Sequence, residues 1–252
     1  MHGPTLTQGS SHLHDLWMAF RERWARDIDV GIRSDDSRVL APMNTVVWSA
    51  VLWAQAASLS VDGEASRAWV TVDPADTLLS GLSHRHVVVA DRLEGKVRFD
   101  EGAGTCSVQV QTSVADLRVD PTEKRKELGF EKKLSDADRK SVRKNMLAQG
   151  QLWAQRFPRI RFSADSCEWL GDGRVFVKGR LKIRGVSTRL YLPVRLEPVE
   201  EGIRVRTEFT KRHEDFGFEP YKAALGALKN GDALSFEVDI RLRTRAAEPD
   251  GP

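Results

Sequence analysis

Residues 175–183 read VFVKGRLKI, and apolar side chains return there at every second position. The odd positions carry Val, Val, Gly, Leu and Ile, whereas Lys178, Arg180 and Lys182 occupy even positions. A period of two places successive side chains on opposite faces of an extended chain. This stretch therefore predicts a β-strand with one dry face and one wet face.

The same alternation recurs on both sides of this strand, over 106–114, 159–162, 190–196, 203–209 and 234–242. Short segments rich in Gly, Asn and Asp separate these stretches, so consecutive strands should pair antiparallel. Their dry faces must meet, either as two stacked sheets or as one sheet closed on itself, and closure also removes the exposed edges. The pattern favours an all-β barrel.

The composition is that of a globular protein. Of the 252 residues, 40% are apolar, and the 19 glycines bring the total to about 47%. Lys and Arg number 39 against 36 Asp and Glu, and the resulting net charge of +3 is too small to indicate a nucleic-acid binder. Two cysteines exclude a disulfide-dense scaffold and a structural zinc site built mainly of thiolates.

The first 42 residues form an N-terminal extension to this pattern. Residues 11–28 carry one apolar stripe at helical spacing with arginines nearby. They predict a helix that binds a membrane surface or a partner, or one that packs on the domain. A third interpretation is that translation starts at Met43 and that residues 1–42 are a mis-annotated start.

Residues 43–57 resemble a signal peptide. The uncharged run 46–54 is too short to span a bilayer, and the small residues Ala54 and Ala56 predict cleavage after Ala56. The alternative is a short buried helix, since no Lys or Arg lies between Met43 and the run. A start at Met43 predicts a periplasmic or secreted protein; otherwise we expect a cytoplasmic one.

Residues 122–150 interrupt the strand pattern with a charged helical insertion. Ser135 and Asp138 form a capping-box pattern, and Gly150 is expected to end the helix. The insertion has nine basic and five acidic residues, a net charge of +4 (9 − 5). It predicts either transient contact with anionic lipid headgroups or a solvated helix with mixed charge pairs.

Four motifs in the β region resemble a known family. They are LSGLSHRH at 79–86, RFPRIRF at 156–162, VKGRLKIRGVS at 177–187 and DFGFEPY at 215–221. Together they resemble the YceI-like, polyisoprenoid-binding family, in the branch that has a His-x-His opening motif. The resemblance covers residues 68–246.

The resemblance implies an eight-stranded antiparallel barrel of lipocalin-like shape. It also implies a lumen that holds an isoprenoid, isoprenoid quinone or fatty-acid-like lipid, in a protein exported to the periplasm. Two departures are local: Arg85 stands where the family has an aspartate, and the insertion after Leu117 is longer and more basic.

The candidate binding residues are the uncharged residues of the dry faces, with Gly179 and Ala164 leaving room among them. The predicted lumen residues are Val108, Val110, Ile160, Phe162, Leu181, Ile183, Leu190, Leu192, Val205, Phe209, Phe236 and Val238. A small barrel is either filled by side chains or holds one ligand, and periodicity cannot separate the two. The family resemblance favours the ligand; the alternative is a structural or interaction module with a solid core, whose basic insertion docks a partner.

The histidines are candidates for the mouth of the barrel. His84 and His86 are two residues apart on one face of an extended segment, and His213 could complete a metal set. A structural hydrogen-bonding role is favoured, so we predict no metal. The chain has no nucleophile elbow, phosphate loop or dinucleotide fingerprint. We therefore expect a binding protein without catalytic residues or a cofactor, whose partner is a hydrophobic small molecule and not nucleic acid.

The alternation of apolar and polar residues places the two cysteines on opposite faces of their strands. Cys106 shares the dry face with Val108, whereas Cys167 is out of phase with Phe162 and should point outward. Cysteines on opposite faces cannot be bridged, so the sequence predicts two free thiols even in an oxidising compartment, unless a bulge shifts the register of one strand.

Overall fold

The computed structural model describes residues 57–76, 84–100, 105–223 and 228–244. The helix predicted over 11–28 lies outside the described residues, as does nearly all of the signal-like segment. The described residues belong to one compact unit that begins at Ala57.

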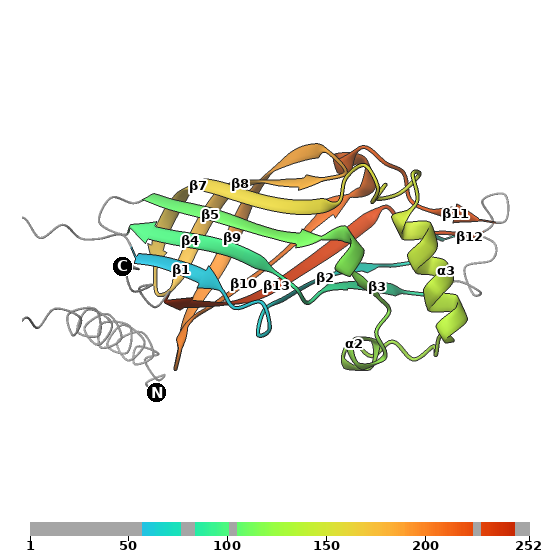
Figure 1. Ribbon diagram of the computed structural model, residues 1–252, viewed down its shortest axis with the longest axis horizontal. Coiled ribbons are helices and arrows are strands. Elements are labelled where there is room, and N and C mark those ends of the chain that lie inside the picture. Colours follow the sequence, from blue (N-terminus) through green and yellow to red (C-terminus); the bar gives the residue numbers. More distant parts are fainter. Residues whose placement is uncertain (1–56, 77–83, 101–104, 224–227, 245–252) are drawn as a thin grey trace, which may run out of the picture. The chain divides into compact units, whose positions relative to one another are not determined.

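Long antiparallel strands make up most of this unit (Figure 1). The strands are β1 (Ala57–Val61), β2 (Arg67–Val72), β3 (His86–Ala90), β4 (Glu94–Asp100), β5 (Thr105–Ser113), β6 (Arg118–Val119), β7 (Arg159–Gly171), β8 (Arg174–Ile183), β9 (Val186–Val199), β10 (Gly202–Arg212), β11 (Lys222–Ala223), β12 (Leu228–Lys229) and β13 (Ala233–Thr244).

Eight of the described strands close into a ring. Their order is β1-β4-β5-β7-β8-β9-β10-β13, and β13 pairs back onto β1 with every pairing antiparallel. Near one end, β2 and β3 extend the wall beside β13. The prediction of an eight-stranded antiparallel barrel is confirmed.

The strand pattern first becomes clear in the sequence at residue 68, but the barrel begins earlier, with β1. Leu59 of β1 is 3% exposed, and it pairs with Val97 of β4 on one side and Thr244 of β13 on the other. β1 has only five residues, too few for its alternation to stand out beside the small residues that precede it. This short strand nevertheless closes the ring.

The prediction of two free thiols is wrong, because Cys106 and Cys167 form a disulfide between β5 and β7. The strand pairing shifts register between Ala164 and Ser166, so one extra residue, Asp165, interrupts the alternation. Such a bulge reverses the faces of all later residues in the strand. Cys167 therefore points inward with Cys106, and both are less than 10% exposed.

The charged insertion folds into two helices, α2 (Thr122–Glu127) and α3 (Asp136–Leu147). The capping box of Ser135 and Asp138 is present, but α3 ends at Leu147, with Ala148 as its C-cap, and not at Gly150. No helix in the described part of the chain is both long and apolar enough to cross a membrane.

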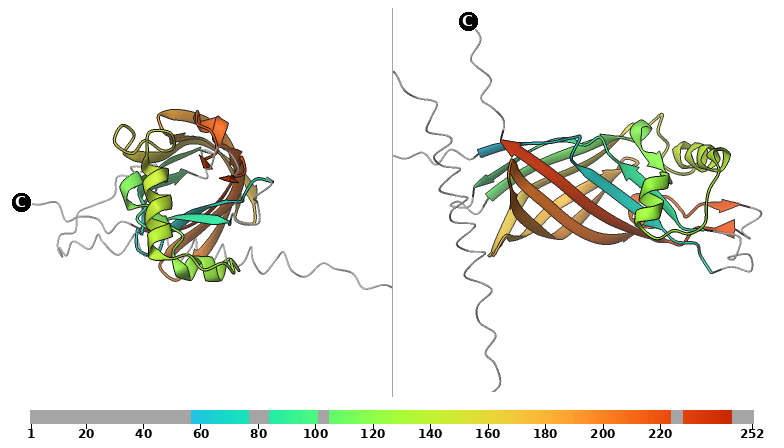
Figure 2. Two further views of the ribbon diagram at one scale, coloured as in Figure 1. Left: turned by 90° about the vertical axis from the view of Figure 1, so that its right-hand side faces the viewer. Right: turned by 90° about the horizontal axis from the view of Figure 1, so that it is seen from below.

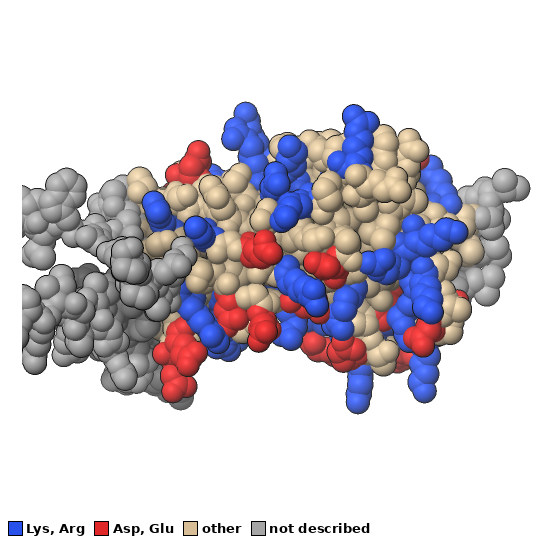
Figure 3. Space-filling view, viewed as in Figure 1, with Lys and Arg blue, Asp and Glu red and all other residues tan. Residues whose placement is uncertain are grey.

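The expectation of a solvated helix with mixed charge pairs holds for α3, which has no buried residue and an Asp136–Arg139 ion pair, but not for α2. Lys124 and Arg125 of α2 are buried, at 7% and 4% exposure. The Lys124 Nζ lies 3.2 Å from the ring centroid of Trp69, a cation–π contact that fixes α2 against β2. The insertion's basic surface is thus smaller than its sequence suggests. Charges of both signs are interspersed on the face drawn in Figure 3.

The disulfide yields the first prediction. It closes a separation of 61 residues, so reduction should lower the free energy of unfolding by about 2–4 kcal/mol. Denaturant unfolding with and without reductant measures this change. Thiol titration of the denatured, unreduced protein should detect no free thiol, and two thiols per chain would contradict the pairing.

Candidate functional site

The interior of the barrel contains a cavity of about 360 Å³. Its wall is almost entirely apolar and comes from every strand of the ring except β1. All twelve predicted lumen residues lie on it: Val108, Val110, Ile160, Phe162, Leu181, Ile183, Leu190, Leu192, Val205, Phe209, Phe236 and Val238. The sheet thus surrounds an apolar space large enough for a small ligand.

The space next to Gly179 is not part of this cavity, contrary to the expectation that Gly179 would leave room. A Cβ at this position would lie 2.6 Å from the Phe162 ring and 2.7 Å from the Ser163 carbonyl oxygen. Gly179 therefore lets the aromatic ring on β7 cross over β8. Phe162 itself lines the cavity.

Polar side chains line the cavity mainly at the end near α3. His86 at the start of β3, Asn145 of α3, His213 just after β10, and Tyr221 all contribute to the wall. Figure 2 looks into this end, where α3 lies beside the opening of the ring. Asn145 donates to the Tyr221 hydroxyl at 2.9 Å and so links α3 to the segment before β11. We call this region the polar end.

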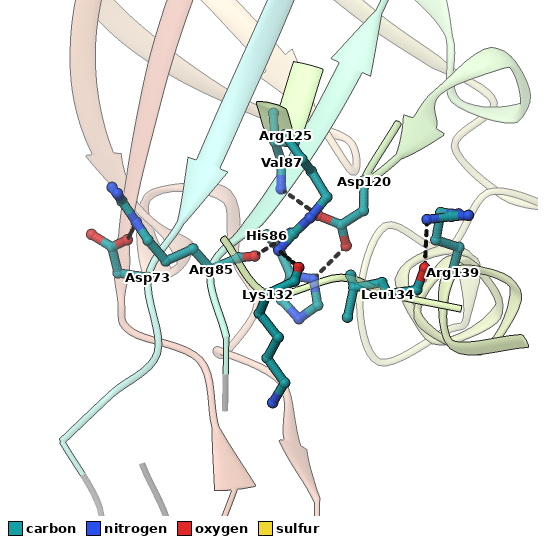
Figure 4. Close-up of polar contacts among 9 residues, drawn as sticks. All are labelled: Asp73, Arg85, His86, Val87, Asp120, Arg125, Lys132, Leu134 and Arg139. Carbon is teal, nitrogen blue, oxygen red and sulfur yellow. Dashed lines mark hydrogen bonds and ion pairs between the residues drawn. The ribbon is translucent and has the colours of Figure 1, made fainter. Parts of the chain in front are cut away.

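A buried ionic network holds His86 at the polar end (Figure 4). Asp120 has no exposed surface, and its Oδ2 lies 2.6 Å from the His86 Nδ1. Its Oδ1 accepts hydrogen bonds from the Val87 backbone N–H at 3.0 Å and from Arg125 at 2.8 Å. Since an ionised carboxylate only accepts, Nδ1 of His86 carries the proton that faces Asp120.

Arg125 connects this network to three parts of the chain. Besides Asp120, its guanidinium donates to the carbonyl oxygens of Arg85 at 2.7 Å and Lys132 at 2.8 Å. It therefore ties α2 to the segment that precedes β3 and to the loop that leads to α3. A guanidinium with several fixed donors suits this bridging role better than an ammonium group.

The electrostatics of Asp120 follow from these contacts. Burial alone raises the pKa of its carboxyl group, but the hydrogen bonds from His86, Val87 and Arg125 outweigh burial and lower the pKa below its usual value. Asp120 also has a left-handed backbone, with φ of 49°. Asp tolerates this conformation better than most residues.

The other two candidate histidines lie in different surroundings. His213 is 3% exposed, and its Nδ1 donates to the Asp232 carbonyl oxygen at 2.8 Å; burial lowers its pKa. It therefore has the structural hydrogen bond that the sequence analysis favours. The His84 ring lies beside that of His86, with centroids 4.5 Å apart and ring planes tilted by 59°, and His84 is not itself part of the cavity wall. In the described part of the chain, no cluster of three His, Cys, Asp or Glu could hold a metal.

Sequence reasoning missed Asp120, Arg125, Asn145 and Tyr221. The dipeptide Asp120-Pro121 indicates a turn, but a turn signal does not reveal a buried carboxylate. Arg125 is hidden within a run of charged residues. Its burial depends on partners that are distant in the sequence.

Breaking the buried ion pair between Asp120 and Arg125 should destabilise the folded protein. Asp120→Asn keeps the shape of the side chain but leaves the Arg125 guanidinium buried without its counter-charge, so the free energy of unfolding should fall by about 3–5 kcal/mol. Glu219→Gln is the control, because the Glu219–Lys222 pair is exposed and should contribute less than about 1 kcal/mol. Equal losses in the two variants would show that the Asp120 network is not structural.

The same variant gives a pH prediction. Because the pKa of Asp120 is lowered by folding, its stabilisation is present above the unfolded pKa of about 3.9 and is lost as the pH falls through the folded pKa. The stability difference between the wild type and Asp120→Asn should be constant near neutrality and shrink below about pH 4. Urea unfolding at a series of pH values measures it; a difference that grows on acidification would contradict the assignment.

Comparison with solved structures agrees with the barrel fold. The crystal structure of BcnA from Burkholderia cenocepacia matches with a TM-score of 0.54 at 14% identity, covering 73% of this chain and 99% of that one. A YCEI protein from Campylobacter jejuni matches with a TM-score of 0.41 at 16% identity, covering 58% and 79%. The BcnA match shows a shared fold.

Comparison of sequences gives the family. No curated protein sequence matches the chain. The family description "YceI-like domain" matches residues 61–246, most of the chain and all of the barrel after β1. The chain therefore belongs to the YceI-like family.

Proposed function

We propose that this protein binds and carries one long-chain amphiphile in the lumen of its barrel, without transforming it. One observation carries the proposal: an apolar cavity of about 360 Å³ inside the barrel has its polar lining residues mainly at one end. An isoprenoid or fatty chain with a polar head has the matching distribution of polarity. The chain occupies the lumen and the head lies at the polar end.

The apolar wall supplies affinity for the chain. Each CH₂ group removed from water contributes about 0.8 kcal/mol, so a long chain is bound without any polar contact. Valine and leucine side chains cannot distinguish strongly between chains of similar width. Selectivity must come from chain length and from the head.

Binding without catalysis accords with the chemistry of the polar end. The Asp120–His86 pair resembles the acid–base part of a catalytic triad. Here, however, the carboxylate is shared with Arg125 and a backbone N–H, which anchor α2 and β3. Both cysteines are in the disulfide, so neither supplies a thiol nucleophile. The members of the family are binding proteins.

Export to an oxidising compartment is part of the proposal. Disulfides persist in the periplasm and outside cells and are rare in the cytosol, and the Cys106–Cys167 bridge supports such a location. Cleavage after Ala56 would also leave β1 complete, because this strand starts at Ala57. A carrier of water-insoluble molecules is useful in the aqueous space beside a membrane.

Filling the lumen tests the proposal. Ala68 lies on β2, lines the cavity and pairs with Ala90 and Val238, so Ala68→Trp places an indole where the chain would lie. Titration of the full chain with parinaric acid, a fluorescent fatty acid, should give saturable binding in the wild type. Affinity should fall at least about tenfold in Ala68→Trp because the lost burial of two CH₂ groups already exceeds 1.4 kcal/mol.

The matched control is Arg67→Trp, which adds the same indole to the adjacent, exposed position of β2. It should bind the probe like the wild type. Far-UV circular dichroism and an intact disulfide confirm that both variants fold. Undiminished binding by Ala68→Trp would exclude the lumen as the binding site.

A further inference from the structure

The outer surface of the barrel carries a block of positive charge on three adjacent strands. Six neighbouring outward positions there hold four basic side chains, two serines and no acid, and all six are exposed. They are Arg161 and Ser163 of β7, Lys182 and Arg180 of β8, and Ser187 and Arg189 of β9. We call this set the basic grid. In Figure 3, basic side chains predominate along the upper margin, where Figure 1 places β7 and β8.

Two cross-strand pairs within the basic grid join like charges. Arg161 lies directly opposite Lys182, and Arg180 lies directly opposite Arg189. Like charges in directly opposite positions destabilise a sheet, whereas opposite charges stabilise it. The folded chain by itself therefore gains no stability from this arrangement, and an anion bound across the pairs would relieve the repulsion.

The rest of the barrel does not neutralise the grid. All four of its basic residues lack an ion-pair partner among the described residues, although Arg159, Lys178 and Arg195, nearby on the same strands, each have one. The next acidic residue along β7 is Asp165, in the bulge, and it forms no ion pair with the grid. The grid therefore presents four charges that are available to an external anion.

An exposed aromatic pair lies beside the grid. Tyr191 follows Arg189 by two residues on the same face of β9, is 50% exposed, and stacks on Phe176 with ring centroids 4.9 Å apart. Its hydroxyl donates to Glu168 at 2.9 Å, which leaves most of the ring facing outward. Tyrosine rings are favoured at the boundary between lipid head groups and water. Exposed aromatic rings next to free cations are therefore typical of a surface that meets lipid.

The grid lies in the half of the barrel wall that is nearer the polar end. β8 ends at Ile183, and the next residue, Arg184, donates to the Gln149 carbonyl oxygen at 3.1 Å, just beyond α3. A surface bound to the grid is thus close to the end where polar residues line the cavity.

We propose that the basic grid docks the protein on the surface of an anionic lipid bilayer, where it binds the phosphate groups of several lipids. Guanidinium groups donate two hydrogen bonds at once to phosphate oxygens, and serine hydroxyls add further donors. A bilayer presents these phosphates as an extended array, which suits an exposed wall better than a pocket. The proposal places membrane contact on the barrel wall and not on the charged insertion. It goes beyond lumen binding and does not depend on it.

Vesicle flotation tests the proposal. The full chain is mixed with phosphatidylcholine vesicles that contain either no anionic lipid or about 30% phosphatidylglycerol, in about 0.1 M salt. It should bind only the anionic vesicles, and the binding should weaken as the salt concentration rises, because exposed charges are screened. The double variant Arg180→Gln/Arg189→Gln should bind at least about tenfold more weakly, since two cations leave the contact.

The matched control is Lys96→Gln/Arg98→Gln. It removes the same charge from exposed positions of β4, the strand across the ring from β9, and should bind like the wild type. Far-UV circular dichroism and an intact disulfide confirm that both variants fold. Binding of parinaric acid is measured separately, so the lumen proposal and the docking proposal can fail independently.

The stability of the protein without vesicles separates docking from a structural role. Arg180→Gln removes a like-charge contact, so its free energy of unfolding should be at least that of the wild type. A marked loss of stability would show that Arg180 holds the wall together and would overturn its assignment to docking.

The binding outcomes decide the rest. Failure of the wild type to bind anionic vesicles, or equal losses in the two double variants, overturns the docking surface. Binding of dextran sulfate, a polyanion in solution, through the grid by a protein that does not bind vesicles also overturns it and indicates a soluble acidic partner.

Discussion

Closure of the sheet between β1 and β13 is the constraint on which the rest of the structure depends. Once the ring is closed, every second residue of its strands faces one common interior. The sequence places Val, Leu, Ile and Phe at nearly all of these positions, and many of them are too small to fill the space completely. A cavity remains, and its wall is apolar because charged residues occupy the alternate, outward positions.

The ends of the barrel cannot rely on this alternation of apolar inward and charged outward residues. Strands stop there, backbone groups lose their ladder partners, and polar contacts must replace them. At the polar end this is done by Asp120, which accepts from the β3 backbone, from His86 and from Arg125 of α2. The same network that holds α2 against β3 positions His86 on the cavity wall, so stability and the polarity of the site share one cause.

The fold and the lumen wall could be predicted from the sequence because both depend on local periodicity. A period of two along β8 and β9 is visible in any short window, and it identifies inward residues without knowledge of their neighbours. The prediction failed where an added residue changes the phase. Asp165 is an ordinary residue in the sequence, yet the bulge there brings Cys167 to the inner face and allows the disulfide.

The polar end was harder to predict because its contacts are long-range. His86 and Asp120 are 34 residues apart, and Lys124 and Arg125 look like members of a solvated charge run. Their burial follows from the docking of α2 on β2 and β3, which no local pattern encodes. The histidine pair was found from its resemblance to a family motif, whereas its buried partners emerged only from the three-dimensional structure.

The central claim is that the lumen holds one long-chain amphiphile. The most direct measurement is mass spectrometry of an organic-solvent extract of the untagged, full-length protein, purified without detergent from its own cells. We expect one chain-bearing amphiphile in about equal molar amount to the protein, absent from an extract of Ala68→Trp prepared in parallel. An extract with no such molecule, from a protein that also binds no added lipid saturably, would contradict it.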